Sequence, residues 1–406
     1  MRSVLLFTLI SVSFSFTYLY PLDLTGNLRT SYYGLEGREP GGAKARNNLL
    51  YQSISLRATE LGLQGLSLGA NFRFRGDASD NLEGGGAARF YSLYLDIVDV
   101  LPAGLALRAG RQFLYNGVGT GHLDGLKSQI EPLPWLLLTG WVGTQARYGA
   151  EAKVASWNEA AMWGGRLLVK EKGGSRVGVS FGQRKRGGNL ERKLLGFDVN
   201  SPRLRWADVY FKADIDLELD KLRNATLRVN PRIGGPLRLD IEYSRRSPTL
   251  SASSFFTIIE YEGYDEVRIL PTYTMKNGLW MGGEYSYVRY RDDDTHRARG
   301  GVSWQGIGGG LLYRQGYAGG RFGGYASMRK DLPHEVEGLI QFDYVKFNLV
   351  EGGSLRAESL VAIFRLTKRM AGGSHFVIEL QEGRNPAFES DFRVFARIDY
   401  RFNLRR

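Results

Sequence analysis

The chain has 406 residues, no cysteine and a formal net charge of +12 at pH 7. The lack of cysteine excludes a disulfide-stapled fold, a cysteine-ligated metal or cluster, and haem attached through a C-x-x-C-H motif. Glycine is abundant (53 residues), while the aromatic share of 12% is too high for a disordered chain, so the glycines indicate tight turns and closely spaced strands.

The basic residues are spread singly along the chain and are not gathered in one helix or tail, so we do not expect nucleic acid as a partner. We interpret the spread of positive charge as a field that favours anions or contacts lipid phosphates. Such a field would lie in the lumen of a channel or at its rim. No apolar run reaches the roughly 18 residues of a membrane-spanning helix. Mean hydropathy is −0.27, but this value does not exclude a transmembrane β-barrel, in which only alternate residues meet lipid.

The first fifteen residues have the pattern of a secretory signal peptide. Arg2 is followed by an apolar run over residues 4–10 and then by serines up to Ser15. Cleavage after Ser13 or Ser15 is expected, and the alternative is a buried first strand. We therefore assign residues 1–15 to the signal peptide and residues 16–406 to one domain, because no linker or low-complexity tract divides them.

Beyond the signal, the chain repeats a two-residue alternation of apolar and polar side chains. The segment from residue 66 to 75 places leucine, alanine and phenylalanine on one face, with Arg73 and Arg75 on the other. Leu105 to Gln112 forms a further strand, in which Arg108 faces the polar side. Such a period indicates strands that separate two different media.

The segment from Tyr115 to Pro134 is rich in glycine and is predicted to be a long loop. Connections of this length are usually functional or disordered. In a barrel the loop could fold inward as a constriction, carrying Asp124, Lys127 and Glu131, or it could be an ordinary surface loop.

The alternation is clearest in three later segments. In residues 204–217 one face is apolar and the other carries Asp208, Asp214 and Asp216. In residues 237–243 one face is apolar and the other carries Arg238 and Asp240. In the last segment, 392–402, the polar face carries Arg393, Arg397 and Asp399.

About twenty such segments with scarcely a helix between them predict an all-β fold. A closed antiparallel up-and-down barrel in a membrane gives every strand the same two media. Allowing for connections, we expect about 18 strands, within an even number from 16 to 20. Tyrosines and phenylalanines at the strand ends fit the aromatic girdles of such barrels.

The chain resembles a Gram-negative outer-membrane porin in its signal peptide, its lack of cysteine, its repeated strands and its aromatic closing strand. The segment Leu107-Arg108-Ala109-Gly110-Arg111-Gln112, followed by Leu123-Asp124-Gly125, is similar to a stretch of alginate-export and related porin-like barrels. One departure is that residues 403–406 follow the final aromatic, Phe402, on which such barrels usually end. The resemblance implies an outer-membrane location and a channel.

The sequence offers little for catalysis or cofactor binding. The four histidines, His122, His296, His334 and His375, form no recognised dyad and no metal-ligand spacing. We therefore expect neither an enzyme nor a cofactor. Selectivity in a pore comes from charges that line it. The pore-lining candidates are Arg73, Arg75, Arg108, Asp208, Asp214, Asp216, Arg238, Asp240, Arg393, Arg397 and Asp399.

Three functions remain open. The leading hypothesis is a porin for passive diffusion of small polar, anionic solutes, in contact with membrane lipid and lipopolysaccharide. The second is a sleeve around a periplasmic partner protein, such as a multihaem cytochrome in an electron conduit; the partner would have to bring the haem. The third is a structural or adhesive barrel whose lumen is plugged by side chains.

Overall fold

The computed structural model describes residues 23–405, apart from residues 39–41, 43, 64, 78–86, 102–103, 148–151, 203, 248–262, 318 and 349–355. The predicted signal peptide, residues 1–15, lies outside the described residues. The described chain is almost wholly β-strand, with one four-residue helix and one 3-10 turn.

The elements follow one another as a series of hairpins. The first half contains β1 (Asp23–Arg38), β2 (Lys44–Thr59), β3 (Leu66–Asp77), β4 (Ala87–Leu101), β5 (Leu105–Asn116), β6 (Gly119–Leu133), β7 (Leu136–Gln145), α1 (Trp157–Ala160), β8 (Ala161–Lys170), β9 (Arg176–Arg186), β10 (Asn189–Ser201) and β11 (Ala207–Asp216). The second half contains β12 (Lys221–Pro231), β13 (Leu237–Arg246), β14 (Tyr264–Thr274), β15 (Trp280–Arg289), β16 (Asp294–Trp304), β17 (Ile307–Gly316), β18 (Arg321–Leu332), β19 (Val336–Asn348), β20 (Arg356–Arg369), η3 (Ala371–Gly373), β21 (His375–Asn385) and β22 (Phe388–Arg405).

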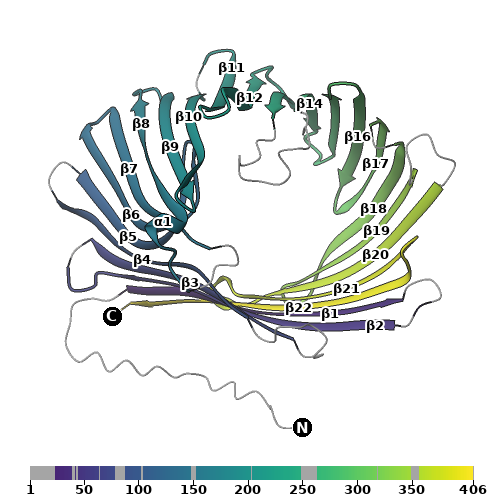
Figure 1. Ribbon diagram of the computed structural model, residues 1–406. Helices are drawn as coiled ribbons and strands as arrows, with labels where there is room; N and C mark the ends of the chain where they lie inside the picture. The colour runs from purple at the N-terminus through teal and green to yellow at the C-terminus, as the bar shows by residue number, and fades with distance from the viewer. Residues whose placement is uncertain are drawn as a thin grey trace, which may run out of the picture.

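Each strand pairs antiparallel with the next one in the chain, and the sheet closes on itself. β1 pairs with β22 along its whole length, from Asp23 opposite Arg405 to Arg38 opposite Ser390. Figure 1 shows the resulting ring, with the first and last strands side by side. The predicted all-β, antiparallel, up-and-down barrel is confirmed.

The predicted strand number is wrong, because the described residues form 22 strands and not about 18. Many reversals use only two to four residues, as at Gly187–Gly188, so more of the chain is left for strands. The segment 115–134 adds to the difference. It was predicted to be a loop, yet most of it is strand β6.

The two ends of the barrel differ in their connections. All connections at the end where the chain enters β1 and leaves β22 have six residues or fewer, as the bounds of the elements show. The opposite end carries the connections longer than six residues, namely residues 78–86, 146–160, 247–263 and 349–355. Bacterial outer-membrane barrels have this asymmetry, with short turns on the periplasmic side and longer loops outside.

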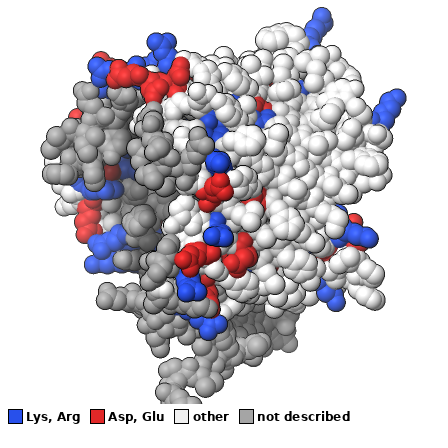
Figure 2. Space-filling model, turned by 90° about the vertical axis from the view of Figure 1, so that its right-hand side faces the viewer, with Lys and Arg blue, Asp and Glu red and all other residues white. Residues whose placement is uncertain are grey.

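The alternation gives the wall two chemically distinct faces. Large apolar side chains such as Leu311, Phe342 and Ile398 are exposed on the outward face, where a soluble protein would present polar groups. Figure 2 shows this on the wall around β17 to β20, where a wide zone free of charged residues borders a file of acidic and basic side chains. Charged residues also lie on the outward face near the strand ends, as Arg245 and Arg289 do, but the predicted lining residues lie on the inward face. An apolar outer face and a charged inner face are the arrangement of a transmembrane β-barrel.

Candidate functional site

The lumen wall is the candidate functional surface, and the predicted lining residues lie on it. Register pairs with neighbouring strands, such as Asp214 opposite Gly196 and Arg393 opposite Gln381, place them on the inward face. The set is Arg73, Arg75, Arg108, Asp208, Asp214, Asp216, Arg238, Asp240, Arg393, Arg397 and Asp399. Their role in lining the pore and in selecting solutes remains a prediction.

Several of these residues are engaged within the wall. Arg108 donates two hydrogen bonds to Asp96, at 2.5 and 2.8 Å. Asp208 accepts one from Arg232 at 2.6 Å, and the carboxylate of Asp216 caps the β11–β12 turn by accepting from the backbone of Glu218 at 3.1 Å. These charges are therefore engaged with partners inside the wall.

Three other arginines form a row across adjacent strands that the sequence pattern did not predict. Arg297, Arg314 and Arg321 are direct register partners on the adjacent strands β16, β17 and β18. Arg297 is 3.9 Å from Glu266, but among the described residues no ion pair holds Arg314 or Arg321. Arg314 donates to the backbone oxygen of Tyr317 at 2.7 Å, and its Nε atom is buried without a partner.

This arginine row borders a groove of about 430 Å³ that Arg299 and Glu284 also line. Like charges directly opposite one another destabilise a sheet. The row therefore gains stability from any anion that neutralises it. One signal could have found it: the two-residue turn Gln305–Gly306 fixes the β16–β17 register and so places Arg297 opposite Arg314.

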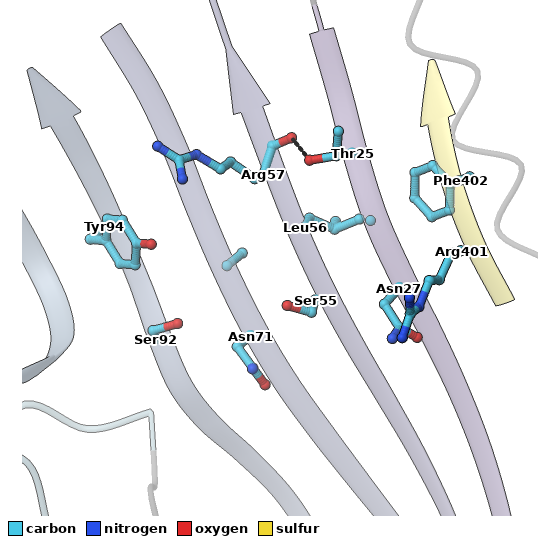
Figure 3. Close-up of a pocket in the computed structure, with 12 residues that line it drawn as sticks. Thr25, Asn27, Ser55, Leu56, Arg57, Asn71, Ser92, Tyr94, Arg401 and Phe402 are labelled. Atoms are coloured by element: carbon cyan, nitrogen blue, oxygen red, sulfur yellow. Dashed lines mark hydrogen bonds between the residues drawn. The ribbon is translucent and has the colours of Figure 1, made fainter. Parts of the chain in front are cut away.

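A second row, of small polar side chains, crosses the seam of the barrel. Asn27, Ser55, Asn71 and Ser92 are consecutive register partners on β1 to β4, and Arg401 extends the row onto β22. Figure 3 shows these side chains lining a pocket of about 530 Å³. They offer hydrogen bonds to a polar solute without crowding the lumen.

The wall is interrupted where the β5–β6 hairpin leaves it. β4 pairs with β5 only up to Leu93 opposite Arg111, and β6 pairs with β7 only up to Leu123 opposite Gln145. Beyond these points residues 112–122 have register partners only among themselves, as far as Asn116 opposite Gly119, although the backbone N–H of Ala146 still donates to the oxygen of His122 at 2.9 Å. We call residues 112–122 the hairpin tip.

A line of three glycines permits the departure. Gly110, Gly125 and Gly143 are register partners on β5, β6 and β7. A Cβ atom on Gly125 would lie 2.2 Å from the backbone oxygen of Val142, and one on Gly143 would lie 2.3 Å from that of Asp124. Only glycine tolerates so close a backbone approach.

The hairpin tip lies against the inner wall of the barrel. A Cβ on Gly119 would meet the ring of Trp141 on β7, and Val118 lies against Gly182 of β9 and Gly196 of β10. The backbone N–H of Val118 donates to Ser180 Oγ at 3.1 Å. Leu114 and Leu123 are buried with Trp141 and Met162 in a small apolar cluster.

The predicted loop over residues 115–134 is thus corrected to a strand whose hairpin tip turns inward. Asp124 is buried and accepts two hydrogen bonds of 2.6 Å from Arg111. Lys127 lies opposite Arg108 on the inner wall, and Glu131 forms a 2.6 Å ion pair with Lys170 near the short-turn end. A constricting role for these three residues remains a prediction.

The structure also explains the motif around Arg108 and Asp124. Arg108 and Arg111 bind Asp96 and Asp124, Gly110 and Gly125 are two of the three glycines, and the amide of Gln112 donates to the backbone oxygens of Arg108 and Gly125. The motif therefore shapes the point at which the hairpin bends.

The described residues show no other class of site. No group of three or more metal-binding side chains occurs among them. Within the same part of the chain, no helix is long and apolar enough to cross a membrane.

Comparison with known proteins finds structural likeness only. No protein-family model and no curated protein sequence matches this chain significantly. Among solved structures it is similar to Pseudomonas aeruginosa OpdQ (9% identity, 94% of this chain and 98% of that one, TM-score 0.47) and to a BenF-like porin from Pseudomonas fluorescens Pf-5 (8%, 96% and 100%, TM-score 0.43). It is also similar to the translocation pore of the P pilus usher PapC (10%, 94% and 99%, TM-score 0.49). Such values identify neither a family nor an activity.

The location follows from the architecture itself. A closed antiparallel barrel with an even number of strands, an apolar outer face and unequal ends belongs to the outer membrane of Gram-negative bacteria.

Proposed function

We propose that this protein is a porin, a channel for passive diffusion of small polar solutes across the outer membrane. The observation that carries the proposal is the closed ring of strands with an apolar outside and a charged inside. A lumen lined by polar groups holds water, and water-filled barrels of this kind conduct small solutes.

We further propose a preference for anions. The net charge of +12 gives the whole molecule a positive field. The arginine row on β16 to β18 concentrates that field on the lumen wall, because Arg314 and Arg321 have no ion-pair partner among the described residues. Guanidinium groups bind carboxylates and phosphates through paired hydrogen bonds. An anion passing the row would meet several such groups in turn.

One observation favours the sleeve as a second candidate. General porins have roughly 16 to 18 strands, whereas barrels of about 22 strands are wide enough to hold a plug. The 22 strands of this chain therefore leave room for a partner protein as well as for solutes.

Planar lipid bilayers test the proposal. Purified protein should produce stepwise conductance increases, and in a KCl gradient the reversal potential should have the sign set by chloride. The double variant Arg314→Gln and Arg321→Gln should move that potential towards cation preference. The matched control is Arg245→Gln with Arg289→Gln, which removes the same charge from the outward face of β13 and β15.

Each outcome decides between the candidates. Absence of conductance by the pure barrel, together with co-purification of a haem protein, would support the sleeve and reject the porin. Conductance with clear cation preference would retain the channel and reject the anion part.

A further inference from the structure

Two aromatic side chains on the hairpin tip are unusually exposed. Phe113 is 57% and Tyr115 is 73% exposed, whereas Leu114 between them is completely buried. The tip is still a β-ribbon, so alternate residues point to opposite faces. One face therefore packs against the barrel wall, and the other carries two aromatic rings.

The exposed face looks into the lumen. Leu114, on the opposite face, belongs to the cluster with Trp141 and Met162, whose side chains are on the inner wall of β7 and β8. The turn that follows Tyr115 crosses the inner side of β9 and β10, where Val118 lies against Gly182 and Gly196. The two exposed rings therefore face the lumen, and contact with lipid does not explain their exposure.

The hairpin tip is anchored at several points. Besides the Val118–Ser180 hydrogen bond, Arg184 of β9 donates to the backbone oxygen of Thr120 at 2.9 Å. The buried Arg111–Asp124 pair fixes its base. Rings on an anchored support lose little conformational entropy when a ligand stacks on them, and this favours binding.

A positive surface adjoins the tip. Arg184, Arg192 and Arg223 line a small pocket of about 80 Å³ together with Val118 and Thr120 of the tip. A solute that contacts the tip is therefore beside cationic side chains.

We propose that Phe113 and Tyr115 form a lumen-side ledge that stacks on the flat face of a ring in a small anionic solute, and so select ring-bearing anions over open-chain ones. Aromatic side chains contribute apolar stacking surface while leaving the solute's charged group free for the nearby arginines. This specificity rests on the proposed channel function.

The test compares three probes on the purified protein in detergent by isothermal titration calorimetry. Glucose 6-phosphate and sorbitol 6-phosphate differ in having a ring or an open chain at the same charge, and benzoate supplies an aromatic ring. The wild type should bind one or both ring probes more tightly than sorbitol 6-phosphate. Phe113→Leu with Tyr115→Leu should weaken ring binding roughly three- to tenfold for each ring lost and leave the open-chain probe unchanged.

A matched control is Tyr325→Leu, which removes a half-exposed tyrosine from the inner wall of β18. It should leave the affinities unchanged. All variants are checked for folding by their heat-dependent migration in SDS gels. Equal binding of ring and open-chain probes by the wild type, or unchanged ring binding by the double leucine variant, would overturn the ledge. Because the readout is binding, a failure of conductance in bilayers would be recognised separately.

Discussion

The guanidinium of Arg29 in the first strand binds the carboxylate of Asp399 in the last strand, and the two residues are direct register partners. Asp399 is completely buried, forms an ion pair with Arg397 at 2.9 Å, and lies 2.8 Å from Nε2 of His375 in β21. A single acidic group thus joins β21, β22 and β1 at the seam where the barrel closes.

Replacing this carboxylate should weaken the closure of the barrel. In Asp399→Asn, the guanidinium groups of Arg29 and Arg397 remain close together without their shared counter-charge. Removing one partner of a buried ion pair typically costs about 3–5 kcal/mol. Thermal unfolding in detergent, followed by circular dichroism, should therefore show a clearly lower Tm.

The control for the seam is Asp391→Asn, on the same strand. Asp391 pairs with Arg393 two residues away and, within the described part of the chain, bridges no two strands, so its loss should lower the Tm much less. Equal Tm values for the two variants would show that the seam network does not hold the barrel closed.

The glycine line makes a prediction about the bend in β6. In Gly125→Ala, the new methyl group would lie 2.2 Å from the backbone oxygen of Val142, so the strands must separate locally. Overpacking of this kind costs roughly 1–3 kcal/mol. Gly76→Ala on the outward face of β3 is the comparison, because nothing lies within 4 Å of its added carbon. Unfolding that is unaffected by Gly125→Ala would mean that the bend does not depend on this contact.

The buried Arg111–Asp124 pair should control the position of the hairpin tip. Arg111→Met leaves a carboxylate buried without its partner and loosens the base of the tip. Single-channel recordings should then show added current noise or a second conductance level as the tip moves. Arg108→Met breaks the neighbouring pair with Asp96, in which the arginine is about one-third exposed, and should disturb the recordings less. Identical traces from both variants would contradict an anchoring role.

Much of the wall could be predicted from the sequence because its pattern is local. The apolar and charged faces of β22, with Arg393, Arg397 and Asp399 inward, follow from the two-residue period alone. The same holds for the acidic side of β11.

The hairpin tip and the arginine row could not be predicted in this way. The inward turn of β5 and β6 depends on Gly110, Gly125 and Gly143 meeting across three strands, and on the fit of Val118 against β9 and β10. These contacts are set by register between distant segments. A glycine-rich stretch such as residues 115–134 therefore resembles a loop when it is considered alone. Because this stretch was not counted as a strand, the predicted strand number was too low.

The most direct test of the account asks which medium each face of the wall meets. The chain has no cysteine, so single cysteines can be introduced along β19 without background labelling. Gln341 and Asp343 face inward, while Ile340, Phe342 and Tyr344 face outward. In proteoliposomes, cysteines at positions 341 and 343 should react with a charged, water-soluble thiol reagent, and those at 340, 342 and 344 should react only with a lipid-soluble one. Reaction of all five with the charged reagent, or the reverse pattern, would contradict a membrane barrel with a water-filled lumen.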